Sequence, residues 1–436
     1  MTDAGHPYAE FVDAAIGHGS LERANTILAA CPNVATSDIH AAAILGDDGL
    51  VRRFLERHPE DAVAKGGPRG WDALTHLCFS RYLRLDASRS SGFVRAAEAL
   101  LDAGASANTG FYEVNHHPEP VFESALYGAA GMAHHAELTR LLIDRGADPN
   151  DEEVPYHAPE THDNRALKVL VESGKVSDDN LAVMLLRKHD WHDYDGVRWL
   201  LERGADPNRQ TRWRRTATHQ AVLRDNAHDI FEVLLDNGAA PTPEVVALAA
   251  RRGRGALLAL FERRGISTAL EGADSLIAAC ARNQADLVRA LAERDPELVR
   301  EIGTQGGMLL AQFSGNGNTD GVCHLLDLGI EVDANHEGDA YWDIATESTA
   351  LHVAASRAQH ATVRLLIECG AAIDLADGKG RTPLALAVRA CVNPYLAYRR
   401  SPQSVMALLQ AGASVEGIDI PSGYEVVDTL LRAQRA

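Results

Sequence analysis

The sequence predicts an all-α solenoid of about twelve helix-turn-helix modules. One short pattern, typical of the end of a helix, recurs along the chain. A second pattern, typical of the start of a helix, recurs upstream of it. With 436 residues, the chain is also longer than most domains with a single hydrophobic core. Growth by repetition accounts for all three observations.

The recurring helix ending is a pair of leucines, two polar residues and then Gly-Ala. The clearest copies run over 141–150, 200–208 and 234–241, with weaker copies over 100–108, 365–374 and 408–415. Glycine readily adopts the left-handed conformation with which many helices end. The pattern therefore predicts that the second helix of each module stops at this glycine.

The recurring helix start is clearest at 349–355, 381–387 and 216–222, where a threonine precedes paired small residues. Threonine caps helices, proline fits their first turn, and paired alanines allow close helix packing. The two patterns together resemble the Thr-Pro-Leu-His and Gly-Ala-Asp signatures of the ankyrin repeat, with its period of about 33 residues. The resemblance covers most of the chain. It implies an elongated groove that binds another molecule.

At this period the second helices are expected to end near Cys31, His58, Gly104, Gly146, Gly174, Gly204, Gly238, Gly265, Asp295, Gly329, Gly370 and Gly412. Modules one, two, eight and nine are degenerate. Proline follows three of their endings, at Pro32, Pro59 and Pro296, where glycine is usual. The segment 424–435 has the polar residues that a closing helix needs.

These modules fall into four expected groups, over residues 1–68, 69–242, 243–335 and 336–436. Three segments depart from the plain repeat: extra residues over 84–92, a long finger over 110–121 and an insertion over 393–402. The finger contains Phe111, Tyr112, His116 and His117. Such excursions often gather on the binding face of a repeat protein.

The composition excludes several classes of partner. The net charge is −19 and the pI about 5.4, which opposes general attraction to nucleic acid or to an anionic membrane. The N-terminus lacks a secretory pattern and no apolar run reaches membrane-spanning length. We therefore expect a cytoplasmic protein, a monomer because both ends resemble caps. The alanine and arginine content and the Gly-Ala-Asp-Pro-Asn endings resemble bacterial ankyrin proteins.

The six cysteines stand singly inside apolar helical patterns. We expect them to be reduced core residues without a disulfide framework or a zinc site. His189 and His192 are three residues apart on an expected helix, but no second ligand pair has a recognisable spacing. Neither a metal nor a cofactor is therefore expected.

Modules five and six break their own pattern. Pro159 and Glu160 in module five, and Lys188 and His189 in module six, stand where the repeat has paired small residues. Ionisable groups in a packed position are costly unless they are paired or hydrated. A sequence that breaks its local rules often does so at a functional site.

Charges are also segregated in this region. Residues 148–163 contain six carboxylates and no lysine or arginine, whereas 209–215 contains four arginines around Trp213. Two alternatives stay open: the acidic and basic fingers pair with each other, or they bind a partner or an anion. Arginine and tryptophan are common anchors of protein interfaces.

We therefore expect a protein- or peptide-binding groove centred on modules three to seven. The predicted contact residues are His76, Phe79, Tyr156, His162, Arg187, Asp190, Trp191, His192, Tyr194, Arg212, Trp213 and Arg224. The alternative is a site for a small anionic ligand, or a hydrolytic site, in modules five to seven.

A hydrolytic site would use His157, Glu160 and Asp163 as an acid–base set. His157, however, occupies the usual histidine position of the ankyrin repeat. The resemblance implies that this histidine, like His219 and His352, hydrogen-bonds neighbouring backbone. We therefore favour a binding role over an enzymatic one, and the hydrolytic site stays the alternative.

Overall fold

A computed structural model describes residues 7–115 and 118–435. The chain forms two compact units, Met1–Ala239 and Ala240–Ala436. The first contains the expected modules one to seven, and the second contains modules eight to twelve. Apart from one two-stranded sheet and isolated bridges, the regular elements of the described residues are helical, which confirms the all-α fold.

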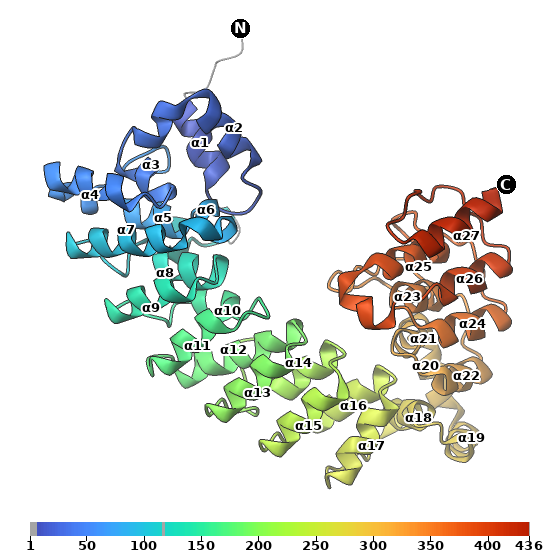
Figure 1. Cartoon of the computed structure of the whole chain (residues 1–436). Helices are drawn as coiled ribbons and strands as arrows, with labels where there is room; N and C mark the ends of the chain where they lie inside the picture. The colour runs from blue at the N-terminus through green and yellow to red at the C-terminus, as the bar shows by residue number, and fades with distance from the viewer. Residues whose placement is uncertain (1–6, 116–117, 436) are drawn as a thin grey trace. The chain divides into compact units, whose positions relative to one another are not determined.

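In the first unit each module contributes two helices that lie in separate layers (Figure 1). The first helices are α1 (Pro7–Ala15), α3 (Ile39–Ile44), α5 (Ala73–Cys78), α8 (Ala125–Tyr127), α10 (Val154–His157), α12 (Asp178–Asp190) and α14 (Ala217–Leu223). The second helices are α2 (Glu22–Ala30), α4 (Asp48–Arg57), α7 (Ser90–Asp102), α9 (Ala136–Asp144), α11 (Arg165–Glu172), α13 (Tyr194–Glu202) and α15 (His228–Asp236). Module three adds α6 (Arg81–Leu85) and the 3-10 turn η3 (Ala87–Arg89), and module four extends α8 by the π-helical turn η4 (Gly128–Met132).

The second unit repeats the arrangement. Its first helices are α16 (Pro243–Arg251), α18 (Gly272–Ala281), α21 (Gly306–Gly315), α23 (Ala350–Ser356) and α25 (Pro383–Val392). Its second helices are α17 (Gly255–Arg263), α19 (Ala285–Arg294), α22 (Thr319–Asp327), α24 (His360–Glu368) and α26 (Gln403–Gln410). The insertion in module twelve forms the 3-10 helix η5 (Pro394–Arg399), and the expected closing helix is present as α27 (Glu425–Arg435).

The second helices end where the sequence predicted. The glycines at nine of the expected endings have positive φ, from 69° at Gly174 to 102° at Gly104, because a left-handed residue turns the chain out of the helix. At the other three endings the proline begins a new helix instead. These helices are η1 (Pro32–Thr36), η2 (Pro59–Ala62) and α20 (Pro296–Thr304).

The predicted starts and core positions are also confirmed. Thr216 caps α14 by accepting a hydrogen bond from His219 N, and Thr382 caps α25 in the same way. Of the paired leucines, Leu142, Leu200 and Leu234 are fully buried. The leucines therefore build the core between the two helical layers, and the polar residues that follow them end the helices.

The long finger is a β-hairpin. Strand β1 (Gly110–Glu113) pairs antiparallel with β2 (Val121–Ser124), with Phe111 opposite Glu123 and Tyr112 opposite Phe122. Side chains alternate between the two faces of a strand. Phe111, Glu113 and Glu123 therefore share one face, and Tyr112 and Phe122 share the other. His116 and His117 lie outside the described residues.

The cysteines only partly match the expectation. All six are free, and Cys78, Cys280 and Cys391 are buried, but Cys31 and Cys323 are half-buried and Cys369 is exposed. Cys369 directly follows α24, at the point where the chain leaves the core, so its side chain meets solvent. Among the described residues, no helix combines the length and apolar character needed to cross a membrane.

Candidate functional site

A row of aromatic rings follows the first helices and fingers of modules two to seven. Successive ring centroids lie 4.0–5.7 Å apart, distances at which aromatic rings contact each other. The rings, in order, belong to His40, His76, Trp71, Phe111, Phe79, Tyr127, His157, Tyr156 and Trp213. We call these nine residues the aromatic row.

The members of the aromatic row differ in exposure. Trp213 is 38% exposed, and Trp71, Phe111 and Tyr156 are half-buried. His76 is fully buried and Phe79 is 4% exposed. The prediction that His76 and Phe79 line an open surface is therefore wrong, because Trp71 packs against both rings. These two side chains support the exposed rings from beneath.

Gly131 allows modules four and five to approach closely in the aromatic row. A Cβ at this position would lie 2.6 Å from the Tyr127 ring and 2.9 Å from Cβ of His157. Both distances are far below van der Waals contact. The glycine in η4 therefore makes room for the contact between Tyr127 and His157, whose ring centroids are 5.0 Å apart.

His157 lies between two carboxylates. Its Nε2 donates to Glu153 Oε2 at 3.1 Å and its Nδ1 donates to Glu160 Oε2 at 2.9 Å. Burial alone would lower the pKa of His157, but the two carboxylates raise it to about 9. The expectation of a backbone hydrogen bond is wrong here, whereas His352 does bond the carbonyl of Leu375. The reason is that Glu153 and Glu160 stand within one helical turn of His157.

The acid–base set proposed from the sequence is only partly assembled. His157 and Glu160 are together, but Asp163 forms an ion pair with Arg165 at 2.6 Å. A histidine with a pKa of about 9 carries its proton at neutral pH and has no free nitrogen to act as a base. The pair therefore has the properties of a structural ion pair.

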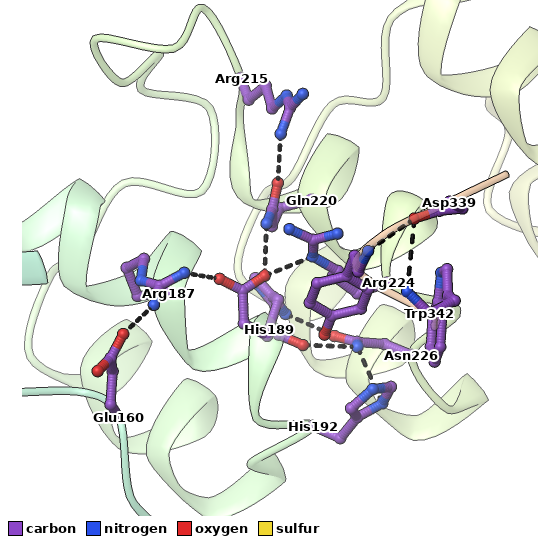
Figure 2. A network of polar contacts seen from close by, with 12 residues as sticks. Glu160, Arg187, His189, His192, Arg215, Gln220, Arg224, Asn226, Asp339 and Trp342 are labelled. Carbon is purple, nitrogen blue, oxygen red and sulfur yellow. Dashed lines mark hydrogen bonds and ion pairs between the residues drawn. The ribbon is translucent and has the colours of Figure 1, made fainter. Parts of the chain in front are cut away.

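A polar network next to this pair joins modules five, six and seven. Arg187 contacts Glu160 and Asp190, and its guanidinium lies 3.9 Å from the centroid of the Tyr156 ring. Asp190 Oδ1 also accepts hydrogen bonds from Gln220 and from Arg224, each at 2.6 Å. Figure 2 shows Arg187 beside Glu160, whereas Gln220 and Arg224 donate to the carboxylate of Asp190.

Module six buries the two ionisable residues that replace its small residues. Lys188 is fully buried, and its Nζ donates to Asp193 Oδ2 at 2.7 Å and to the Thr161 carbonyl at 2.5 Å. Asp193 in turn caps α13 by accepting from Gly196 N. The lysine is therefore paired, as burial of a charge requires.

His189 is also fully buried and bonds within the chain. Its Nδ1 donates to Asn226 Oδ1 at 2.8 Å, and Asn226 Nδ2 contacts both the His189 carbonyl and His192 Nδ1. Burial lowers the pKa of His189 to about 4. Asn226 thus bridges the two histidines. Within residues 7–115 and 118–435, no group of three or more His, Cys, Asp or Glu side chains is arranged to hold a metal ion.

The acidic and basic fingers do contact each other. Arg212 NH1 lies 3.0 Å from Glu152 Oε2, and the Arg212 guanidinium lies over the Trp213 ring at 4.7 Å. The ion pair is largely exposed, so it contributes little stability. Of the alternatives for the segregated charges, mutual pairing is thus present for Arg212 and Glu152.

Three predicted contact residues lie apart from the aromatic row. His162 and Trp191 form a separate edge-to-face pair with centroids 6.1 Å apart. Tyr194 begins α13, in the layer of second helices, where it lines a surface depression of about 390 Å³ with Arg198 and Asp229. The structure therefore gathers Tyr156, Arg187, Asp190, Trp213 and Arg224, but neither this pair nor Tyr194.

Comparison with known proteins bears on the fold. Family models described as ankyrin repeats match residues 182–235 and 307–419. The chain contains ankyrin repeats over these two segments. It is 39% identical over 106 residues to human "Ankyrin repeat and SOCS box protein 16", a match that covers 24% of this chain and 19% of that protein. The chain thus spans about a fifth of the length of this relative.

A solved ankyrin structure is also similar. The crystal structure of the human ASB11 ankyrin repeat domain matches 58% of this chain and 97% of that chain, with 18% sequence identity and a TM-score of 0.26. Ankyrin repeats are general protein–protein interaction modules. The matched residues 182–235 include Arg187, Asp190, Gln220 and Arg224 of the polar network and the finger of Trp213, but not Glu160.

Sequence reasoning missed several members of this ankyrin surface. Trp71 and Tyr127 belong to the aromatic row. Glu153 contacts His157, Gln220 donates a hydrogen bond to Asp190, and Glu123 lies near enough to His157 for the two charges to interact. The available signal was positional: Trp71 and Trp213 each stand shortly before a first helix, and Phe111 lies in the long finger that precedes α8. Aromatic residues at equivalent places in successive ankyrin fingers would have indicated the row.

Proposed function

We propose that the aromatic row binds an extended segment of a protein partner. The observation that supports this proposal is the unbroken series of ring contacts from module two to module seven. Aromatic residues that only fill the core of each module need not form a continuous series of ring contacts along the solenoid. Interfaces are enriched in tryptophan, tyrosine and arginine, which bury large planar surfaces.

The direction of the row defines the shape of the partner. Its members come from one module after another, so a ligand that touches Trp71, Phe111, Tyr156 and Trp213 must lie along the stack. An extended peptide or a long loop meets that requirement. The sequence predicted a concave groove centred on modules three to seven, and the stretch proposed here includes those modules.

Anion binding or hydrolysis has less support. The cations that lie over rings of the row, Arg69, Arg187 and Arg212, each contact a carboxylate of the same chain, and so does Arg224. An incoming anion would have to displace a carboxylate such as Glu160 or Asp190 from its cation. Peptide binding requires no such rearrangement, since Trp71 and Trp213 are already accessible to solvent.

The test uses peptides selected on the full chain from a displayed random library, long enough to span several modules. Trp71→Ala and Trp213→Ala should each weaken the selected peptides by about 2 kcal/mol, roughly thirtyfold in Kd. Trp199→Ala is the matched control, because Trp199 lies on the second helix α13 and stacks with Lys168 and Arg203. Equal loss in all three variants would refute the proposal.

A further inference from the structure

The insertion in module twelve presents two tyrosines and two arginines to solvent. In η5 (Pro394–Arg399), Tyr395 is 70% exposed and Tyr398 is 77% exposed. Side chains three residues apart in a 3-10 helix lie on the same side, so the two rings share one face. The Arg399 guanidinium lies over the Tyr398 ring, 5.1 Å from its centroid, and the exposed Arg400 follows directly. We call these two tyrosines and two arginines the η5 patch.

Hydrogen bonds fix the backbone of the insertion to the neighbouring helices. His360, the first residue of α24, donates from Nε2 to the carbonyl of Arg399 at 3.1 Å. Cys391, near the end of α25, donates from Sγ to the carbonyl of Ser401 at 3.4 Å. The η5 patch is thus exposed on a backbone that is already held in place. Preorganisation of this kind reduces the conformational entropy that a surface loses when it binds.

The insertion lies within a basic stretch of an acidic chain. The net charge of the chain is −19, yet residues 378–415 contain no aspartate or glutamate. The cations of this stretch are Lys379, Arg381, Arg389, Arg399 and Arg400. The sign of the charge is therefore reversed locally.

A carboxylate from an earlier segment compensates the start of this stretch but not the insertion. Asp343 lies 2.5 Å from Lys379 Nζ and 2.5 Å from an Arg381 guanidinium nitrogen. Arg399 and Arg400, by contrast, form no ion pair with any described residue. The η5 patch therefore combines two uncompensated positive charges with two exposed aromatic rings.

We propose that the η5 patch binds an acidic segment of a protein partner, with aspartate or glutamate side chains on Arg399 and Arg400 and an apolar side chain against Tyr395 and Tyr398. Tyrosine and arginine are among the residues that contribute most to protein interfaces. Charge complementarity selects the occupant, because a neutral or basic segment would leave both arginines unpaired. This surface lies in the second unit, so it is separate from the aromatic row of the first.

A nucleic acid or an anionic membrane fits the patch less well. Either would extend beyond the η5 patch, and its remaining phosphates would face a protein with a net charge of −19. A short acidic segment interacts mainly with charges within about 8–10 Å, because salt screens the more distant ones. The local reversal of charge therefore favours a short segment over an extended polyanion.

The test measures binding of the full chain to an array of synthetic peptides rich in aspartate and glutamate, each beside a copy with asparagine and glutamine at those positions. Acidic peptides should bind the parent chain, and the amide copies should bind about tenfold more weakly or worse. The double variant Arg399→Gln with Arg400→Gln, and separately Tyr398→Ala, should each weaken the acidic peptides by a similar factor. Arg263→Gln and Arg289→Gln, on the second helices α17 and α19, are matched controls and should change Kd less than about twofold.

Three results would overturn the proposal. The first is that no acidic peptide binds the parent chain, or that the double arginine variant binds these peptides at full strength. The second is that single-stranded oligothymidylate binds through the same arginines more tightly than every peptide, which would assign a nucleic-acid site. The third is that the parent chain self-associates and the double arginine variant does not, which would make a second copy the occupant.

Two measurements keep the result unambiguous. Because the side chains of the η5 patch are exposed, the variants should melt at the same temperature as the parent, and a melting curve verifies this. Trp71→Ala should leave binding of the acidic peptides unchanged. If Trp71→Ala weakens them as much as the arginine variants do, the peptides do not report on a separate surface and the proposal is wrong.

Discussion

Arg224 donates a hydrogen bond from Nε to Oδ1 of Asp190, 2.6 Å away, across the boundary between modules six and seven. The Asp190 side chain is only 5% exposed and the Arg224 side chain 16%. A carboxylate this deeply buried needs donors. Arg187, Gln220 and Arg224 supply them, so the Asp190 carboxylate joins modules six and seven, and Arg187, which also contacts Glu160, extends the network to module five.

Arg224→Ala should therefore lower the free energy of unfolding by about 2 kcal/mol, because a buried charged hydrogen bond is lost. Urea denaturation followed by circular dichroism measures the change. Arg212→Ala is the control, since its ion pair with Glu152 is exposed and should matter little. If Arg224→Ala unfolds like the parent protein but no longer binds the selected peptides, then Arg224 is a contact residue, as the sequence alone predicted.

Lys188→Ala should destabilise the protein by about 3–5 kcal/mol, because it leaves the carboxylate of Asp193 buried without its cation. Leu200→Ala, which removes a fully buried core side chain, should lower the free energy of unfolding by about 2–5 kcal/mol. It serves as the reference for the effect of Lys188→Ala. Both are measured as shifts in the urea midpoint. The double variant Lys188→Met with Asp193→Asn should recover part of the loss, and failure to recover any would argue against a paired charge.

Stability should fall as the pH rises from about 6.5 to about 9. The pKa of His157 is raised to about 9 in the folded chain, whereas an unfolded histidine titrates near 6.5. The folded state therefore holds this proton more tightly, and the stabilisation, fully present below pH 6.5, is lost as the pH passes 9. Denaturation at a series of pH values should show a flatter profile for His157→Gln in this range.

Below pH 7, the pH dependence of the free energy of unfolding should depend on Glu123. Burial and the charges of nearby carboxylates raise its folded pKa to about 7, above that of an unfolded glutamate, so its ionisation destabilises the fold as the pH rises toward 7. Glu123→Gln should remove this part of the slope and leave the part above pH 7 unchanged. If His157→Gln and Glu123→Gln change the pH dependence of stability over the same pH range, His157 and Glu123 titrate as one coupled pair.

Cys369 should be the first thiol to react in the folded protein, because it is the exposed member of the six. Mild alkylation followed by intact mass spectrometry should show one adduct, which Cys369→Ser abolishes. Burial raises the pKa of Cys78 and of Cys280, which further protects them. Early modification of Cys78 or Cys280 would contradict the packing described.

Trp191→Ala tests whether the binding surface extends beyond the aromatic row. The sequence predicted a contact role for Trp191, and the structure pairs it with His162 away from the row. Weaker binding of the selected peptides at an unchanged melting temperature would assign the pair to the same surface. Unchanged binding would limit the surface to the aromatic row.

The sequence by itself determined the repeat. Left-handed glycines such as Gly146, threonine caps such as Thr216 and buried leucines such as Leu200 each act within one or two helical turns. A local rule therefore sufficed to place the helices. The sequence also indicated modules five to seven, because Glu160 and Lys188 broke that rule.

Only the tertiary structure decided which of these residues face outward and which pair with one another. The contacts of Asp190 with Arg224, of Trp71 with Phe111 and of Glu123 with its neighbours join residues of different modules or fingers. Their formation depends on how one module packs on the next, which no short pattern contains. For that reason the buried positions of His76 and Phe79, and the exposure of Cys369, emerged only from the packed chain.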